Sequence, residues 1–469
     1  MQTFPASTLP IIILGAGPAG LTAGHQLAKA GKKVLILEAS NKVGGLSSSF
    51  QLWGQTVDLG PHRFFSKDDK INQLWMEASR EAYDTVPRQT RIFYKNRFFQ
   101  YPLEAWNALT NLGLWNSICC LASYVKIKFF PLPSKDNFES WVTNRFGARL
   151  YNTFFKTYSE KLWGIPCTEL HSDFASQRIK KLSLGEAIKN ALFGNQKKHQ
   201  SLVDEFLYPK GGTGKIYENL ADSIKNYGGN VQLNCPATGF LQSGDCITAV
   251  QTPLGNFECS DLISSIPLTL LATQLHNTTD VQAACAGLSY RNTVLVYLQC
   301  LAEKNPFTDN WIYVHSSELR VGRITNFNNW GNSLNPERRP ETILCLEYWT
   351  NQNEEDWNTW DDQKWGRLAI EEIEKTGLIP KGSIQATYTL KIGKSYPVYR
   401  TDYKTHVQVL INHLSQIKNL QAIGRYGAFK YNNQDHSILM GILAAENLLG
   451  KSHNLWDVNT DYEVYQESK

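Results

Sequence analysis

The stretch that decides the fold is Ile11-Ile12-Ile13-Leu14-Gly15-Ala16-Gly17-Pro18-Ala19-Gly20, an apolar run that leads directly into a glycine-rich turn. Four consecutive apolar residues at 11–14 are typical of a strand buried on both faces of a parallel sheet. A helical pattern follows from Gly20 to Ala30, and a second apolar strand, Lys33–Leu37, ends at Glu38. The sequence therefore predicts a complete β-α-β unit here.

The three glycines of the turn have separate physical roles in the binding of a dinucleotide. Gly15 permits the tight turn, Gly17 lets the backbone approach a pyrophosphate, and Gly20 allows close packing of helix on strand. Amides at the helix N-terminus then face the anion. Glu38 comes 18 residues after Gly20 and is placed to accept hydrogen bonds from a ribose hydroxyl. If the glycines formed a turn by chance, the strand before them, the helix after them and the position of Glu38 would be unexplained.

Two further segments favour FAD over NAD. Lys42-Val43-Gly44-Gly45 follows Glu38 at a spacing that resembles the amine-oxidase-like flavoprotein superfamily. Gly424-Arg425 follows a predicted strand and resembles the segment that covers the FAD pyrophosphate in that superfamily. A second helix N-terminus and an arginine give a longer cofactor additional anion stabilisation. The expected FAD-binding residues are Gly15, Gly17, Gly20, Glu38, Gly44, Gly45 and Arg425.

Charge and cysteine content exclude several other classes of protein. The 469 residues include 47 Lys and Arg against 43 Asp and Glu, without a block of like charge, so we expect no nucleic-acid partner. The nine cysteines are irregularly spaced and form no CxxC pair. This pattern favours free thiols in a reducing cytosol, and we expect a cytoplasmic protein without a metal site.

No segment has the length and apolarity of a membrane-spanning helix. The longest apolar stretch, Leu114 to Val125, is shorter than the ~18–20 residues that span a bilayer. We therefore expect no transmembrane segment. Peripheral contact with a membrane surface through residues 111–133 is an alternative that the sequence leaves open.

The pattern along the chain predicts an α/β fold in which a Rossmann-type FAD-binding domain is interrupted twice. Helical spacing dominates the first interruption, where single helices are expected over 103–129, 138–163 and 185–193. Stretches rich in β-branched and aromatic residues dominate the second. The expected units are a discontinuous FAD-binding domain (1–100, 205–265 and 391–469), a helical insert (101–204) and a sheet-rich substrate domain (266–390).

Within the flavoprotein superfamily the chain resembles the UDP-galactopyranose mutases. Residues 58–64 (Asp-Leu-Gly-Pro-His-Arg-Phe) are similar to the mutase motif whose histidine, here His62, lies beside the flavin. Residues 154–164 are similar to the helix that carries a uracil-stacking tyrosine, here Tyr158, and an active-site tryptophan, here Trp163. The resemblance implies that these two residues bind the substrate.

The same resemblance extends to residues that would contact a diphosphate. Arg178 falls near one diphosphate-binding arginine of the mutases, and Arg323 is similar to the second. Tyr396 and Tyr431 are similar to the two diphosphate-contacting tyrosines. Arginine forks and phenol donors suit a diphosphate chemically. The resemblance thus implies catalytic roles for His62, Arg178, Arg323, Tyr396 and Tyr431.

This resemblance implies an FAD-dependent nucleotide-sugar mutase that interconverts pyranose and furanose forms of a UDP-sugar. In such enzymes N5 of reduced FAD attacks the anomeric carbon and expels UDP, and the sugar ring opens and recloses through a different hydroxyl. No net redox change occurs. NADH and NADPH are candidate electron donors for reduction of the flavin, and the sequence does not identify the donor.

Two alternatives stay open. Residues 163–170 (Trp-Gly-Ile-Pro-Cys-Thr-Glu-Leu) are also similar to flavoproteins of the protoporphyrinogen-oxidase type, and 432–437 differ from bacterial mutases. An FAD-dependent oxidase or desaturase is therefore the main alternative, and a flavoprotein that binds a nucleotide sugar without turnover is the third. Two arginines in the pocket argue against an apolar substrate, because unpaired buried charge is costly.

Overall fold

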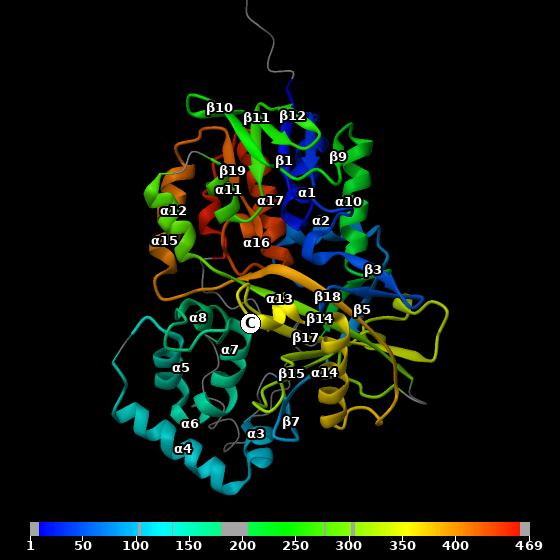
Figure 1. The fold of residues 1–469 in the computed structure, drawn as a ribbon, viewed down its shortest axis with the longest axis vertical. Coiled ribbons are helices and arrows are strands. Elements are labelled where there is room, and N and C mark those ends of the chain that lie inside the picture. Colours follow the sequence, from blue (N-terminus) through cyan, green and yellow to red (C-terminus); the bar gives the residue numbers. More distant parts are fainter. Residues whose placement is uncertain are drawn as a thin grey trace, which may run out of the picture.

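The computed structural model describes residues 9–101, 105–133, 135–179, 205–275, 278–301 and 305–459. Two large sheets dominate it, a five-stranded parallel sheet and a seven-stranded mixed sheet, with a group of helices beside the second sheet (Figure 1). The predicted α/β fold is confirmed. All nine cysteines carry free thiols.

The parallel sheet is the Rossmann-type sheet that the glycine-rich stretch predicts. Its strand order is β19-β13-β1-β2-β9. All of its strands pair in parallel, and β1 is buried along its whole length. The strands are β1 (Ile11–Leu14), β2 (Val34–Leu37), β9 (Asn230–Gln232), β13 (Asp261–Ser264) and β19 (Leu420–Ala422). The uniform apolarity of β1 and β2 follows from their central position, where both faces of the sheet are covered.

Two helices that begin at the same edge of this sheet frame the expected cofactor site. Helix α1 (Pro18–Lys29) follows β1, and α17 (Gln434–Leu448) follows β19 through the short α16 (Gly424–Gly427). The two long helices pack closely, because a Cβ on Gly441 would lie 2.5 Å from the carbonyl oxygen of Ala19. Pro18 and Gln434, the first residues of the two helices, line one cavity at the place where a dinucleotide pyrophosphate binds in such folds.

The rest of the nucleotide-binding half consists of smaller sheets and surrounding helices. Strands β10 (Gly239–Ser243), β11 (Cys246–Thr252) and β12 (Gly255–Glu258) form an antiparallel sheet, and β3 (Ser49–Leu52) pairs with β4 (Gln55–Asp58). Strand β5 (Tyr83–Pro87) pairs with β8 (Glu205–Pro209). The helices of this half are α2 (Asp69–Ser79), α10 (Gly214–Asn226), α11 (Leu268–Gln274), α12 (Thr279–Gly287) and α15 (Tyr403–Leu414).

The seven-stranded sheet has the order β18-β14-β17-β16-β15-β6-β7. Its members are β6 (Thr90–Tyr94), β7 (Arg97–Gln100), β14 (Tyr290–Leu301), β15 (Trp311–Val314), β16 (Arg323–Asn326), β17 (Glu341–Thr350) and β18 (Ile384–Pro397). Helices α13 (Glu355–Thr359) and α14 (Asp362–Lys375) lie beside it. The three-domain division stays a prediction. Strand pairing crosses two of the predicted domain boundaries. Strand β6, before the boundary at 100, pairs with β15 of the predicted substrate domain, and β18 continues through the boundary at 390.

The helical group contains α3 (Ala105–Leu112), α4 (Leu114–Phe129), α5 (Phe138–Phe146), α6 (Ala148–Leu150), a π-helical turn (Tyr151–Phe155), α7 (Lys156–Trp163) and α8 (Asp173–Ile179). The single helix predicted over 138–163 is wrong, because the chain breaks at Gly147. That residue has φ +85°, and a Cβ there would lie 2.8 Å from the backbone of α4. The helix predicted over 103–129 likewise breaks, at Gly113. The helix predicted over 185–193 lies outside the described residues.

Candidate cofactor and substrate site

A cavity of about 420 Å³ extends from the glycine-rich turn to the seven-stranded sheet. It is lined by residues from both halves of the molecule, so the parallel sheet and the mixed sheet share one site. The predicted residues on its wall are Gly15, Gly17, Glu38, Gly45, His62, Arg323, Tyr396, Arg425 and Tyr431.

The glycines of the turn differ in what surrounds them. Gly15 has φ +95°, and a Cβ on Gly20 would lie 2.0 Å from the Gly15 carbonyl oxygen, so the fold requires glycine at both positions. At Gly17 the nearest atom to an added Cβ would be the Cα of Gly45, at 3.9 Å. Gly17 and Gly45 thus leave bare backbone facing the cavity, as the approach of a pyrophosphate requires. Gly44, φ +102°, donates its amide to the Ala16 carbonyl at 2.7 Å.

The Glu38 carboxylate lies on the cavity wall and ties two loops together. Oε2 accepts a hydrogen bond from the Ala16 amide at 2.6 Å, and Oε1 accepts from the amide and hydroxyl of Ser40, both at 2.8 Å. These bonds hold the glycine-rich turn against the end of β2. Glu38 therefore lies where the sequence motif requires an acceptor for a ribose hydroxyl.

Two hydrogen-bond donors of Arg425 have no acceptor among the described residues. Its Nη1 donates to the Asn432 carbonyl at 3.2 Å, whereas Nε and Nη2 are buried without a partner among the described residues. The guanidinium carbon lies 4.4 Å from the ring centre of Tyr396 and 4.8 Å from that of Tyr431. Because unmet buried donors of a cation are costly, this arrangement fits a pyrophosphate oxygen beside the guanidinium.

The loop that carries His62 is anchored through Asp58. The Asp58 carboxylate accepts hydrogen bonds from the hydroxyls of Ser49 (2.5 Å) and Tyr208 (2.7 Å) and from the Thr213 amide (3.1 Å). Burial raises the pKa of Asp58 to about 6. Tyr297, on β14, donates to the Asp58 carbonyl at 2.7 Å. The loop is thus fixed from both halves of the protein.

His62 is held as a neutral imidazole. Burial, with the positive charges of Arg323 and Arg425 nearby, lowers its pKa to about 4. Its Nδ1 donates to the Gly60 carbonyl at 3.1 Å. With Nδ1 protonated, Nε2 of the neutral ring is left as a hydrogen-bond acceptor beside the cavity.

The lowered pKa of His62 predicts a pH dependence of stability. Between about pH 6.5 and pH 4 the unfolded chain binds a proton at His62 that the folded protein does not bind. Stability from the neutral ring is therefore complete above pH 6.5 and is lost as the pH falls through about 4. The free energy of unfolding, measured with urea, should fall between about pH 7 and about pH 4.5 in wild type. In His62→Asn this fall should be smaller by about 2 kcal/mol. The value allows for solvent screening, because His62 is only half-buried.

His406→Asn provides the matched control for this measurement. His406 lies on α15 and is paired with Asp402 at the surface, away from the cavity. This variant should keep the wild-type difference in unfolding free energy between the two pH values. An equal acid loss in wild type and His62→Asn would contradict a neutral His62.

Arg323 is already paired with a buried carboxylate. Its Nε donates to Glu347 Oε1 and its Nη2 to Glu347 Oε2, both at 2.5 Å. Glu347 is buried, and a Cβ on Gly60 would lie 3.2 Å from its Oε1, so this ion pair backs the His62 loop. The charge of Arg323 is balanced within the protein. This corrects the sequence argument that treated Arg323 as an unpaired buried charge.

An aromatic cluster contributes two tyrosine side chains to the cavity wall. Tyr396 and Tyr431 stack with ring centres 5.5 Å apart. Trp163 is fully buried behind them and meets both rings edge-on, at 6.2 and 5.6 Å. Tyr158 stacks on His315 at 4.6 Å. Trp163 and Tyr158 do not line the cavity, and their predicted contact with substrate stays a prediction.

Sequence reasoning missed several cavity residues. Tyr101, Trp311 and Tyr313 line the cavity, and Glu347 pairs with Arg323 behind it. The alternation of Trp311 and Tyr313 along a strand was the available signal, because residues two apart share one face. The backbone of Arg178 lies in the last turn of α8, and its side chain is outside the described part of the structure.

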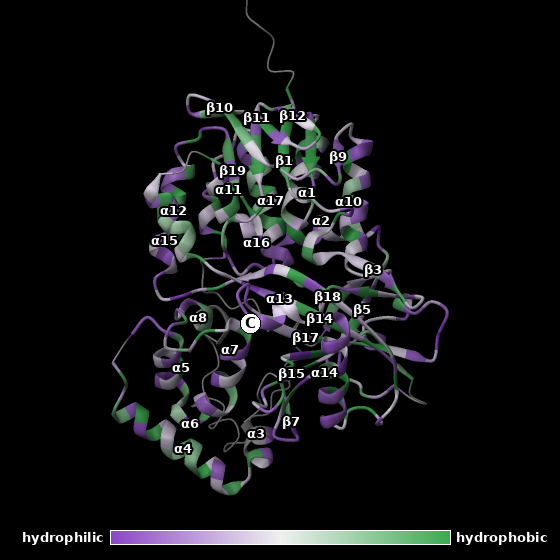
Figure 2. Cartoon of the chain, in the orientation of Figure 1, coloured by the Kyte–Doolittle hydropathy of each residue, from purple (hydrophilic) through white to green (hydrophobic). Residues whose placement is uncertain are grey.

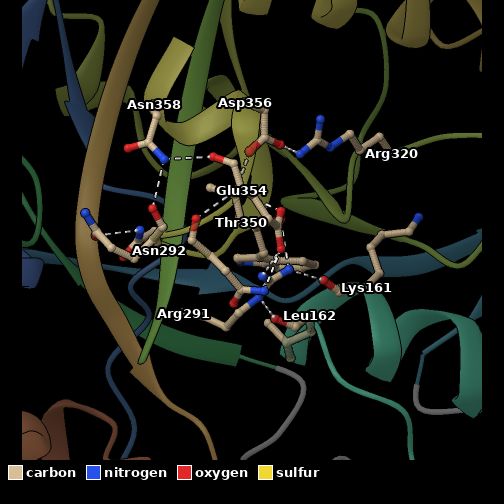
Figure 3. Close-up of polar contacts among 12 residues, drawn as sticks. Lys161, Leu162, Arg291, Asn292, Arg320, Thr350, Glu354, Asp356 and Asn358 are labelled. Carbon is tan, nitrogen blue, oxygen red and sulfur yellow. Dashed lines mark hydrogen bonds and ion pairs between the residues drawn. The ribbon is translucent and has the colours of Figure 1, made fainter. Parts of the chain in front are cut away.

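Arg291 holds the C-terminal end of α7 against the sheet (Figure 3). It donates to the carbonyls of Leu162 (3.0 Å) and Trp349 (3.0 Å) and pairs with Glu354 at 3.1 Å. Gly164, φ +67°, ends the helix, and a Cβ there would lie 2.5 Å from the Arg291 guanidinium. Arg291 also stands opposite Tyr396 in the β14–β18 register. It therefore fixes Trp163 relative to the tyrosines.

Lys161 joins α7 to the connection between β15 and β16. Its ammonium lies 2.8–3.1 Å from four backbone carbonyl oxygens, which share its three N–H donors; they belong to Val314, Ser316, Leu319 and Val321. Burial lowers the pKa of Lys161 to about 8. The connection it holds leads from Tyr313 to Arg323, so α7 also positions this part of the cavity wall.

The fold and the cavity together define a dinucleotide-binding flavoprotein in which a Rossmann-type half faces a sheet-rich half. Comparison with known proteins agrees. The chain belongs to the family described as flavin containing amine oxidoreductase, which matches residues 18–380. This family implies FAD as the cofactor. The bare glycine backbone and the unmet donors of Arg425 fit that group.

Similar proteins include both mutases and oxidases. A solved structure of reduced UDP-galactopyranose mutase superposes with a TM-score of 0.84 at 22% identity and covers 98% of this chain and 99% of that one. Coproporphyrinogen III oxidase of Staphylococcus aureus is 26% identical over 50% of this chain and 56% of its own length. UDP-galactopyranose mutase of Mycoplasma pneumoniae is 26% identical over 48% and 55%. The chain thus spans about half the length of these curated relatives.

Proposed function

We propose that this protein is a flavin-dependent mutase that interconverts the pyranose and furanose forms of a UDP-sugar. The proposal rests on one observation above others: Arg323, Tyr396 and Tyr431 line the same cavity as the flavin-binding turn. This cavity offers a guanidinium and two phenols close to where the flavin would bind, which is the chemistry that a sugar diphosphate needs.

Each of these side chains would have a defined role. Arg323 and the phenols of Tyr396 and Tyr431 would stabilise the charge that develops on the departing diphosphate. Nε2 of the neutral His62 would accept a hydrogen bond from a sugar hydroxyl. Reduced FAD, when bound, would supply the nucleophile for the anomeric carbon. NADH or NADPH as the source of its electrons is part of the proposal.

A second candidate is an FAD-dependent oxidase or desaturase. Glu347 neutralises Arg323, so the charge argument against a less polar substrate is weaker than the sequence suggested. The aromatic wall of Tyr101, Trp311 and Tyr313 would also suit an apolar substrate. The similarity to a coproporphyrinogen III oxidase points in the same direction.

Binding of UDP should depend on the geometry of the Arg323 fork. We expect the FAD-loaded protein to bind UDP and Arg323→Lys to bind it about tenfold more weakly. Lysine keeps the charge opposite Glu347 but has no planar group that can hold this carboxylate through two nitrogens and present a third to a diphosphate. Isothermal titration calorimetry at low and at high salt measures both the affinity and its ionic component.

Arg91→Lys is the matched control. Arg91 forms the same kind of fork, with Asp309, on the same sheet, but it is not part of the cavity wall. Its substitution should leave UDP affinity unchanged. The nucleotide-sugar proposal fails if wild type binds no UDP with the flavin either oxidised or reduced.

A further inference from the structure

Helix α4 carries an apolar face that points away from the protein. Leu114 is 81% exposed, Trp115 74% and Phe129 75%. In Figures 1 and 2 the helix lies along the outer edge of the helical group, at the end of the molecule opposite the parallel sheet. The other exposed large apolar residues here are Ile118, Leu121, Val125, Phe130 and Leu132. Apolar area this concentrated on one surface marks an interaction site.

The side chains of α4 follow a regular pattern around its axis. With about 100° per residue, Leu114, Ile118, Val125 and Phe129 fall on one outward stripe. The residues on the opposite, buried side include Ser117 and Cys120. On the same basis Lys126 and Lys128 fall on the two flanks of the stripe. Both are exposed. The helix is therefore amphipathic with its apolar face outward and a lysine on each border.

The charge along this segment is of one sign. The sequence holds no Asp or Glu from residue 105 through residue 135, whereas Lys126, Lys128 and Lys135 lie within it. Arg149 adds a further positive charge, since it hydrogen-bonds Asn116 of α4 at 2.8 Å. An apolar face flanked by these cations complements a surface with an apolar interior and an anionic boundary.

We propose that α4 and the following residues Phe130–Leu132 dock on an anionic lipid bilayer, with the helix lying in the plane of the interface. Tryptophan and phenylalanine would enter the acyl boundary while Lys126 and Lys128 extend to the phosphate groups. No helix among the described residues is long and apolar enough to cross a membrane, and α4 itself has 16 residues. A second copy of the chain fits less well, because pairing two such faces would bring together lysines without carboxylates.

Vesicle sedimentation tests this proposal directly. FAD-loaded protein should sediment with phosphatidylcholine vesicles that contain about one-third phosphatidylglycerol, and much less with pure phosphatidylcholine or at high salt. Lys126→Gln with Lys128→Gln should lower the partition coefficient about fivefold per lysine. Trp115→Ser with Phe129→Ser should lower it at least tenfold on the same vesicles.

Matched variants on other surfaces control for general changes in charge or apolarity. Leu254, 60% exposed at the β11–β12 turn, is replaced by Ser, and the exposed Lys225 and Lys381 are replaced by Gln. These changes should leave sedimentation at the wild-type level. Circular dichroism and bound flavin verify that each variant is folded.

Three outcomes would overturn the proposal. The first is no sedimentation with anionic vesicles. The second is sedimentation that the α4 variants leave unchanged. The third is that wild type forms a dimer in analytical ultracentrifugation, binds no vesicles, and dissociates when Trp115→Ser and Phe129→Ser are combined. That result would assign the face to a second copy of the chain. UDP binding is measured separately, so the result does not depend on the proposed mutase activity.

Discussion

Isomerised sugar should form only when the bound FAD is reduced, and the flavin should still be reduced at the end of the reaction. The physical reason is that only the reduced ring has the electron density to attack an anomeric carbon. The protein would hold the diphosphate through Arg323, Tyr396 and Tyr431, which line the cavity whether or not the flavin ring can act as a nucleophile. Oxidised protein should therefore bind UDP-sugars but give no product above the protein-free control.

The measurement is an anaerobic incubation of each redox form with a panel of UDP-sugars. Chromatography identifies the products, and the absorbance spectrum reports the flavin. The mutase predicts product without consumption of oxygen or of stoichiometric reductant. An oxidase predicts the reverse, because it starts from oxidised flavin and accepts a hydride. Bleaching of the oxidised flavin by a substrate, with no isomer from any sugar, would replace the mutase by the oxidase.

Gly17→Val should abolish FAD binding while the protein stays folded. The nearest atom to a Cβ on Gly17 would be the Gly45 Cα at 3.9 Å, so the protein itself has room for the added atoms. Those atoms would occupy the space in which the pyrophosphate approaches the backbone. We expect wild type to yield close to one FAD per chain after denaturing release, and Gly17→Val to yield none even after reconstitution.

Gly393→Val is the matched control for this loss. Gly393 is exposed in β18, and an added Cβ would meet its nearest atom at 3.9 Å, as at Gly17, but far from the glycine-rich turn. This variant should retain full FAD content. If Gly17→Val binds FAD at the wild-type level, the turn is not the pyrophosphate site. Equal circular dichroism spectra of the two variants separate loss of cofactor from loss of fold.

The cofactor half was predictable because its signals are local. Its signals lie within 30 residues: the buried strand at 11–14, the glycines that follow it, and Glu38. Each of them satisfies a backbone or hydrogen-bonding requirement of the turn itself. The structure confirms this unit as β1, α1 and β2 of the parallel sheet. Gly424-Arg425 was recognisable for the same reason, because a strand and a helix start flank it directly.

The state of the substrate wall depended on tertiary pairing. Arg323 was visible in the sequence, but its neutralisation by Glu347 exists only because β16 and β17 pair with these two residues in register. Tyr158 lies on a helix that resembles a substrate-binding one, yet the packing of His315 against its ring decides what that ring can touch. Periodicity could not show that β6 joins β15, which brings residues 90–94 to the second sheet.

By itself the sequence determined the class of cofactor and the fold around it, because glycine conformation and strand burial are set by neighbouring residues. Tertiary structure alone decided the charge balance of the pocket and the outward direction of the α4 apolar face. Both depend on which distant segments pack together. The length and apolarity of 114–129 were readable from the sequence, but only the fold places Ser117 and Cys120 inside and Leu114 and Phe129 outside.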